Sequence, residues 1–238
     1  MLLDIRRLSK SFGSLKAADG VDLAVARGEA VGIIGPNGAG KTTLFNLIDG
    51  DLAADAGAIC LNGVDITRAK AHERCKAGIG RAYQIPHPFE NLTVLENLLV
   101  AAVHGRSALV RDSVDFCAGI LEDTGLLPRA NTPAGALTLL ERKRLEMARA
   151  LATGPELLLL DEIAGGLTES ECHELVGTIK GIRASGTTIV WIEHIVHALL
   201  AVVDRLVVLN FGRKIAEGNP TTVMASAEVR EIYTGIAA

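Results

Sequence analysis

Aromatic side chains are scarce in this chain of 238 residues: five Phe, two Tyr and one Trp make up 3% of the sequence. Cysteine is scarce as well, and the four thiols form no C-x-x-C pair; they are Cys60, Cys75, Cys117 and Cys172. Structural zinc sites and disulfide frameworks both need cysteines at paired spacings. We therefore expect reduced thiols in a cytoplasmic protein, with no metal held by cysteine.

Long apolar runs and an excess of positive charge are also missing. No run approaches the roughly 18 apolar residues of a membrane-spanning helix, and we expect no signal peptide. The formal net charge is −4, from 24 Lys and Arg against 28 Asp and Glu. This balance argues against a protein that binds nucleic acid through bulk charge. With 49% hydrophobic and 22% charged residues, the chain is expected to be globular with a sizeable core.

A glycine-rich turn lies between an apolar run of strand type and the start of a helix. The spacing of Gly35, Gly40, Lys41 and Thr42 satisfies G-x-x-x-x-G-K-[ST], the P-loop pattern. Its glycines let consecutive backbone N–H groups point inward around an anion, and the helix N-terminus adds partial positive charge. Lys41 can reach the β- and γ-phosphates of a nucleotide, and the Thr42 hydroxyl can ligate Mg²⁺.

The alternative, an ordinary glycine turn, is disfavoured because the motif is complete and has the strand and helix that it requires. The turn therefore predicts binding of a nucleoside triphosphate. A GTPase is not expected, since the sequence contains no Asn-Lys-x-Asp motif. The expected nucleotide-binding residues are Gly35, Pro36, Asn37, Gly38, Ala39, Gly40, Lys41, Thr42 and Thr43.

Before the P-loop, two short strands are expected at residues 2–10 and 21–26, with Phe12 in a polar loop between them. The Phe12 ring either packs as a satellite of the core or stacks on a nucleobase, since every base offers a π-face. After the P-loop, Asn62-Gly63 is a strong hairpin signal. A strand at residues 79–83 is expected to follow.

Gln84 comes directly after that strand, where a lone glutamine is usually a solvated loop residue. Beyond it the pattern becomes helical. Thr93 and Glu96 form a capping box, and a second helix fits residues 112–124. No strand pattern separates these helices, so we expect an all-helical insertion.

Another capping box, formed by Thr138 and Glu141, precedes a helix expected at residues 142–152. Capping alone is a sufficient explanation of the Thr138 hydroxyl. The run Arg142-Lys143-Arg144 is interpreted as a solvated helix face and not as a patch that binds nucleic acid.

Four leucines at residues 157–160 lead into Asp161 and Glu162. Such a run suits a strand buried on both faces of a parallel sheet, and ligands bind at the carboxyl ends of such strands. Asp161 can hold Mg²⁺ through its water shell, and Glu162 can polarise an attacking water. The alternative is a strand-end pair that faces solvent.

A later strand, expected at residues 187–191, ends at the same sheet edge with Glu193 and His194. Alone, such a histidine is more often a satisfied loop residue. The other expected elements are a helix at 169–183, strands at 205–209 and 212–217, and a short terminal helix.

These signals occur in one fixed order that resembles the ATP-binding cassette ATPases over essentially the whole chain. Within that family the chain is similar to the ATPase subunits of branched-chain amino acid importers. The segments that carry the resemblance are residues 34–46, 81–84, 92–97 with Phe89, and 212–218.

The resemblance implies a role for each matching residue. Phe12 would stack on adenine. Gln84 would sense Mg²⁺ and the γ-phosphate and report to a membrane subunit. Asp161 and Glu162 would be the Walker B pair, with Glu162 the catalytic base, and His194 would contact the γ-phosphate. The implied cofactors are ATP and Mg²⁺, with Thr42, Gln84 and Asp161 as the metal-binding residues.

The implied fold is α/β: a P-loop NTPase core with an antiparallel β subdomain and an inserted α-helical subdomain. Residues 1–91 and 136–238 would form the nucleotide-binding core. Residues 92–135 would form the helical subdomain that meets the coupling helix of a membrane subunit.

The sequence departs from the family pattern in two places. The signature, usually Leu-Ser-Gly-Gly-Gln, reads Leu-Thr-Leu-Leu-Glu at residues 137–141, and the D-loop segment at 165–168 lacks its usual aspartate. Thr138 keeps a hydroxyl that can donate to a phosphate across a dimer interface. Leu140 replaces a glycine that permits close backbone approach, and Glu141 brings negative charge near the triphosphate.

Cassette sites are composite, so a homodimer of this chain would carry two weakened sites. A heterodimer with a partner that has a full signature would keep one good site. We therefore expect a second ABC ATPase subunit as partner, in a heterodimer.

The expected function is the ATP-hydrolysing subunit of an ABC importer for branched-chain amino acids or a related small solute. Its partners would be integral membrane permease subunits and, indirectly, a solute-binding protein, with no nucleic acid. It would be cytoplasmic, peripheral on the inner face of the cell membrane. One alternative is a soluble ABC ATPase not involved in transport, although the sequence lacks the coiled-coil insertions or second cassette that this needs. The other is a hydrolysis-impaired regulatory half of a heterodimer, opposed by Glu162 and His194.

Overall fold

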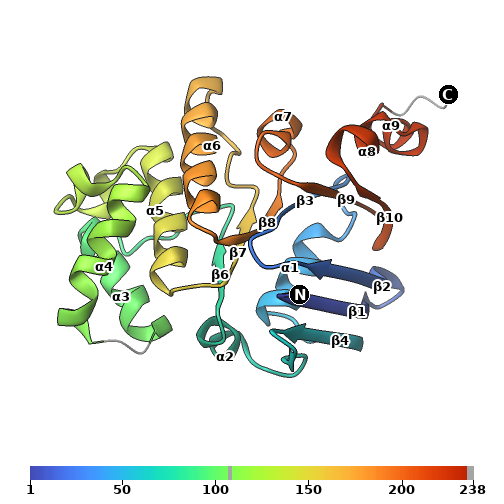
Figure 1. The fold of residues 1–238 in the computed structure, drawn as a ribbon, viewed down its shortest axis with the longest axis horizontal. Helices are drawn as coiled ribbons and strands as arrows, with labels where there is room; N and C mark the ends of the chain where they lie inside the picture. The colour runs from blue at the N-terminus through green and yellow to red at the C-terminus, as the bar shows by residue number, and fades with distance from the viewer. Residues whose placement is uncertain (107–108, 235–238) are drawn as a thin grey trace.

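Two β-sheets carry the fold, which a computed structural model describes for residues 1–106 and 109–234 (Figure 1). The larger sheet has the strand order β10-β9-β3-β8-β7-β6, and the smaller has the order β2-β1-β4-β5. The larger comprises β3 (Ala30–Ile34), β6 (Ile79–Ala82), β7 (Leu157–Asp161), β8 (Thr188–Ile192), β9 (Arg205–Asn210) and β10 (Arg213–Gly218). The smaller comprises β1 (Leu3–Phe12), β2 (Leu15–Val25), β4 (Ala56–Leu61) and β5 (Val64–Asp65).

The larger sheet is parallel except for β10 at its edge. Every residue of β3, β7 and β8 is buried, as expected for strands covered on both faces. Leu160 pairs with Ala82 on one side and with Trp191 on the other. The carboxyl ends of β6, β7 and β8 are therefore level and meet at one edge, where ligand sites form in such sheets.

The first two strands are longer than the sequence predicts. β1 and β2 form a hairpin with only Gly13 and Ser14 between them, where the sequence pattern predicts a loop. The segment is polar because one face of an antiparallel hairpin can be exposed, and shifts of register along β1 interrupt its alternation. Phe12 is thus the last residue of a strand. The hairpin turn predicted at Asn62-Gly63 does form, with φ of 52° and 79°, the left-handed pair that a two-residue turn needs.

Helices cover both faces of the larger sheet and form one end of the molecule (Figure 1). Both predicted capping boxes form, at Thr93 before α3 and at Thr138 before α5. The expected single terminal helix is two helices, α8 and α9. The helices are α1 (Lys41–Asp49), α2 (Ala71–Lys76), α3 (Val94–Arg106), α4 (Val110–Asp123), α5 (Leu139–Ala152), α6 (Glu169–Ala184), α7 (Val196–Leu200), α8 (Pro220–Ala225) and α9 (Ala227–Thr234).

The buried apolar residues form three clusters. One lies between the two sheets and includes α1, and the second lies on the other face of the larger sheet under α6 and α7. The third joins α3 and α4 to α5. Helix α5 belongs to two clusters, because Leu145 and Ala148 pack with α3 and α4 while Met147 and Ala150 pack under the sheet. The division of the chain at residues 92–135 therefore stays a prediction.

Candidate nucleotide site

The P-loop after β3 is held in place by close backbone contacts that only glycine allows. A Cβ atom on Gly40 would lie 2.1 Å from the Ala17 carbonyl oxygen, and one on Gly35 would lie 2.3 Å from the Leu209 carbonyl oxygen. Gly40 is also the N-cap of α1, with φ of 98°. The first turn of α1 contains no acidic residue, so its partial positive charge is not offset there.

A pocket of about 260 Å³ lies over this loop. Its lining includes Phe12 and Leu15 from the N-terminal hairpin, P-loop residues 37–43, and Glu162 from the end of β7. Phe12 is 48% exposed, so its ring is not a core residue. The structure thus brings the ring, the P-loop and the carboxylate, which are far apart in the sequence, to one cavity.

Lys41 is buried at the base of the pocket. Its ammonium donates to the carbonyl oxygens of Gly35 at 2.7 Å and Pro36 at 3.1 Å. Burial lowers the pKa of Lys41, and the charges of Glu162 and Asp161 oppose that shift. A cation held among carbonyl groups at the start of a helix is placed to attract phosphate.

Glu162 has a backbone conformation that is rare outside glycine. Its φ is 47°, and its N–H is anchored to the carbonyl oxygen of Ile192 at 2.8 Å. Strained non-glycine residues of this kind concentrate at functional sites. Gln84 Nε2 donates to Glu162 Oε2 at 2.8 Å, and His194 Nδ1 lies 3.8 Å from the same oxygen. The side chains of Gln84, Glu162 and His194 therefore form one group.

The residue before the histidine has a role that the sequence pattern did not reveal. Glu193 is 1% exposed, and its carboxylate accepts from the backbone N–H groups of Ala164, His194 and Ile195 at 2.9–3.3 Å. Its Oε1 also lies 3.2 Å from His194 Nδ1. Glu193 thus fixes the loop after β8 to the loop after β7. A carboxylate directly after a buried strand was the available signal.

The prediction that Arg142-Lys143-Arg144 is a solvated helix face is wrong for its middle residue. Lys143 is 3% exposed and its ammonium donates to the carbonyl oxygen of Gln84. Burial lowers the pKa of Lys143, and the charges of Glu193, Glu146 and Glu162 oppose that shift. Lys143 therefore ties α5 to the segment that carries Gln84.

At the N-terminus of α5, Thr138 is exposed and its hydroxyl accepts from the Glu141 N–H at 3.3 Å. Leu139 is 44% exposed, and its Cδ2 would lie 3.4 Å from a Cβ on Gly166. Leu140 is only 7% exposed and packs under the larger sheet. The outward-facing leucine at this helix end is therefore Leu139, and the side chain of Leu140 points into the core.

Glu141 is less available as a free charge than the sequence suggests. Its Oε2 accepts from the Thr138 N–H at 2.9 Å, and its Oε1 accepts from Arg129 Nε at 2.9 Å. The Thr138 bond, with Arg129, holds the pKa of Glu141 below its usual range, against a smaller opposing effect of burial. The carboxylate is thus already paired within its own chain.

The residues present fit Mg²⁺ bound together with a nucleotide. Within the described residues, no cluster of three or more His, Cys, Asp or Glu side chains could hold a metal alone. Mg²⁺ commonly uses one or two protein oxygens together with substrate phosphates and water. Asp161 ends β7 and Thr42 lines the pocket, so the donor set is of that kind.

A family model for ABC transporters matches residues 18–165. The chain belongs to the ABC transporter family. It is 34% identical to the high-affinity branched-chain amino acid transport ATP-binding protein BraF of Pseudomonas aeruginosa, over 98% of both chains. It is 36% identical to the corresponding protein LivG of Escherichia coli strain K12, again over 98% of both.

Solved structures of ABC transporter cassettes share the fold. A nucleotide-free ATP-binding cassette is 33% identical with a TM-score of 0.89, over 98% of both chains. The ADP conformation of MJ1267, an ATP-binding cassette, is 34% identical with a TM-score of 0.90, over 99% of both. These matches confirm the cassette fold predicted from the sequence, with ATP and Mg²⁺ as cofactors and ATP hydrolysis as the activity. No helix of the described residues is long and apolar enough to cross a membrane.

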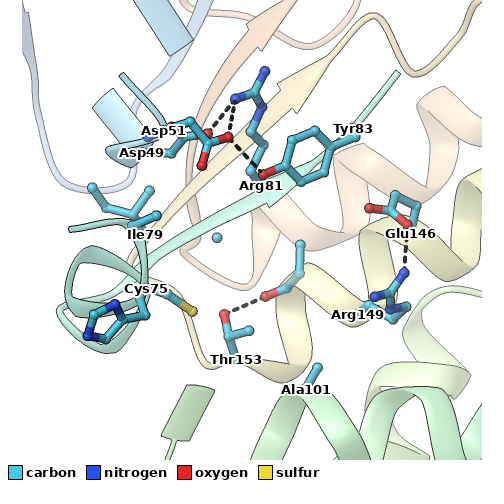
Figure 2. Close-up of a pocket in the computed structure, with 14 residues that line it drawn as sticks. Asp49, Asp51, Cys75, Ile79, Arg81, Tyr83, Ala101, Glu146, Arg149 and Thr153 are labelled. Carbon is cyan, nitrogen blue, oxygen red and sulfur yellow. Dashed lines mark hydrogen bonds and ion pairs between the residues drawn. The ribbon is translucent and has the colours of Figure 1, made fainter. Parts of the chain in front are cut away.

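The cassette has a second pocket, of about 340 Å³, which we call the β6–α5 groove (Figure 2). It lies between α2 and β6 on one side and α3 and α5 on the other. Asp49, Asp51 and Arg81 line one part of it, and Glu146 and Arg149 line another. The groove therefore presents both signs of charge where the predicted helical subdomain meets the core.

Proposed function

We propose that this chain is the ATP-hydrolysing subunit of an ABC importer for branched-chain amino acids or a related small solute. The names of BraF and LivG support the solute class, since both match almost the whole chain. The observation that carries hydrolysis is the Glu162 carboxylate beside the P-loop pocket, in contact with Gln84 and near His194. An ATP-binding protein without activity would not need this arrangement.

The P-loop and Phe12 would bind the nucleotide. Backbone N–H groups at the start of α1 and the Lys41 ammonium would hold the phosphates, in place of the carbonyl contacts that Lys41 makes now. The exposed Phe12 ring at the pocket wall would stack on adenine. Thr42, Gln84 and Asp161 would hold Mg²⁺, which neutralises phosphate charge when bound.

Hydrolysis would depend on three side chains at neighbouring strand ends. Glu162 would take the proton from the attacking water as general base. Gln84 donates to Glu162 Oε2 and so fixes the orientation of the carboxylate. His194, held by Glu193, would contact the γ-phosphate. Because Gln84 also accepts from Lys143 on α5, a shift of α5 would change the position of the base.

The partners would be integral membrane permease subunits, with a solute-binding protein acting through them. The β6–α5 groove would receive the permease, because it is lined by Tyr83, the residue before Gln84, and lies between the core and α3. Its mixed charges, rather than one sign, suit a specific polar contact. This would place the chain in the cytoplasm, peripheral on the inner face of the membrane.

The second ATPase subunit would be a different chain. Leu139 is exposed beside Thr138, at the helix end that would approach the partner's triphosphate. A leucine there is bulkier than the glycine of the usual signature and offers no hydrogen bond. A partner with a full signature would complete the site of this chain in a heterodimer.

Co-expression with candidate permease subunits tests this function. The chain should co-purify with two hydrophobic membrane proteins and a second cassette, and the complex should release phosphate from ATP and import a branched-chain amino acid into vesicles. Failure of the chain to co-purify with any membrane protein would contradict the transport role. Import of an unrelated solute would contradict the solute class alone.

A further inference from the structure

Arg81 on β6 is a buried arginine whose side chain is hydrogen-bonded to two other elements, α1 and β7. Its side chain is 5% exposed. Nη1 donates to Asn46 Oδ1 at 2.7 Å and to Asp49, both on α1. Nη2 donates to Asp161 Oδ2 at 2.6 Å, at the end of β7. The guanidinium also lies 4.5 Å from the ring centroid of Tyr83. Arg81, Asp49 and Tyr83 lie together on one side of the β6–α5 groove (Figure 2).

The face of α1 that Arg81 holds is also the face of Thr42. Thr42, Asn46 and Asp49 follow the spacing i, i+4, i+7, which places them on one side of a helix. Thr42 and Asp161 are two of the three residues that would hold Mg²⁺, with Gln84. Arg81 is therefore bonded directly to Asp161 and to the helix that carries Thr42.

Packing alone does not account for an arginine at this position. Breaking water contacts to bury a guanidinium is costly, and apolar residues of similar volume often stabilise a fold more than a buried ion pair. Arg81 Nε is also buried without a hydrogen-bond partner among the described residues, a further cost. The guanidinium is charged at physiological pH, and its two terminal nitrogens form ion pairs with Asp49 and with Asp161.

We propose that Arg81 is a positioning residue for the Mg²⁺ site. Its guanidinium binds α1 through one terminal nitrogen and β7 through the other, and so sets the spacing between Thr42 on α1 and Asp161 on β7. This rests on the proposed function in one respect, that the site takes Mg²⁺ with ATP. The two arms of a guanidinium reach α1 and β7 at once, whereas the single ammonium of a lysine cannot keep both contacts in place. Arg81→Lys keeps the positive charge but not both contacts, and Arg81→Met removes the charge and the contacts. The two variants therefore separate the effect of charge from the effect of positioning.

The test is a Mg²⁺ titration of nucleotide binding to the isolated chain. A fluorescent ATP analogue is bound first in EDTA, and Mg²⁺ is then added while its affinity is followed. Loss of a partner that orients a metal ligand typically lowers metal affinity about 10- to 100-fold. Both variants should raise the half-saturating Mg²⁺ concentration at least about tenfold, while binding in EDTA, which depends on the P-loop, is unchanged. Full rescue by Arg81→Lys, or an unchanged Mg²⁺ response in both, would overturn the positioning role.

Arg74 provides a matched control. It is 2% exposed, lies on α2, and also holds α1, through the carbonyl oxygens of Leu47 at 2.5 Å and Ile48 at 2.9 Å. It makes no hydrogen bond to Asp161. Arg74→Met should lower the unfolding temperature and leave the half-saturating Mg²⁺ concentration at the wild-type value. An equal shift in Arg74→Met would mean general loosening of α1 and would contradict the proposal.

Asp49→Asn covers the case in which Arg81→Met does not fold. It leaves the contact between Arg81 and Asp161 and removes the charged anchor on α1. The half-saturating Mg²⁺ concentration should rise in this variant, as in the Arg81 variants. A value equal to that of wild type would overturn the proposal. Failure of the wild-type chain to bind the analogue at all would instead contradict the proposed function.

Discussion

This chain offers two halves of a nucleotide site, one for its own nucleotide and one for that of a partner. Different kinds of secondary structure position them. Its own half stands on four neighbouring strand ends: the P-loop follows β3, Gln84 follows β6, Glu162 follows β7 and His194 follows β8. Backbone pairing of level parallel strands fixes these positions. The half that it would lend to a partner is a single helix end, where Thr138 begins α5.

The difference shows which departures from the usual signature matter. Leu140 is buried under the sheet and Glu141 is paired with Arg129, so neither projects from the helix end. Leu139 is exposed there and lies beside Gly166 of the D-loop segment. The chain therefore keeps the polar strand ends of its own half. Of the two leucines that replace signature glycines, only Leu139 is exposed where another chain would approach.

The largest expected effect is on the chain's own half. Glu162→Gln removes the carboxylate that we propose as general base while keeping its size, and general base catalysis typically contributes about 10²- to 10⁴-fold in rate. Phosphate release by the assembled transporter should fall by that factor. Equilibrium binding of ATP should stay at the wild-type affinity, because the P-loop is untouched.

Glu169→Gln is the matched control for this substitution, since Glu169 is an exposed carboxylate in the first turn of α6. Its phosphate release should equal that of wild type. Unchanged turnover in Glu162→Gln would show that Glu162 is not the base.

The next effect separates the two leucines of the signature. Leu140→Ala should reduce the free energy of unfolding by about 2–5 kcal/mol, as for other buried leucines, while Leu139→Ala should change it by less than about 0.5 kcal/mol. Thermal and urea unfolding of the isolated chain measure both.

A second experiment on these leucines measures self-association. In a Glu162→Gln background, Leu139→Ala should strengthen ATP-dependent self-association, which analytical ultracentrifugation can follow. Stronger association with Leu140→Ala instead would assign the obstruction to the buried residue.

Local motifs allowed most of this site to be predicted, because a P-loop or a leucine run before two acids carries its strand and turn with it. Arg81, Lys143 and Glu193 could not be placed in the same way. Each is a charged residue whose partners lie on distant elements, so its role depends on packing that no short pattern encodes. The direction of Leu139 and Leu140 likewise follows from where α5 begins, which the sequence places three residues too late.

The regions of the fold also differ in how well the sequence predicts them. The strands of the larger sheet are predicted well because burial on both faces leaves an apolar run. The two strands of the N-terminal hairpin are predicted too short, because residues 15–20 face solvent in part and the register of the hairpin shifts. The sequence pattern therefore leaves open whether Phe12 is a core residue, and places it in a loop although it is the last residue of β1.

A smaller effect is expected from the cap of α5. Thr138→Ala removes the hydroxyl that accepts from the Glu141 N–H and should cost about 1 kcal/mol of unfolding free energy. Thr138→Ser keeps that acceptor and should restore most of the loss. Both variants should bind ATP as wild type does, since Thr138 belongs to the half offered to a partner. Weaker ATP binding by isolated Thr138→Ala would show that the two halves are not separate.

The smallest effect concerns the charge of Glu141. Its folded-state pKa lies below its usual range, chiefly because the carboxylate accepts from the Thr138 N–H and also pairs with Arg129. A carboxylate with a depressed pKa adds stability above its unfolded-state pKa, and that stability is lost as pH falls through the folded-state value. The unfolding temperatures of wild type and Glu141→Gln should therefore differ at pH 7 and converge as pH drops below about 4.5. A constant difference across this range would mean that the charge is unpaired, and Glu141 would then face the partner's triphosphate as free negative charge.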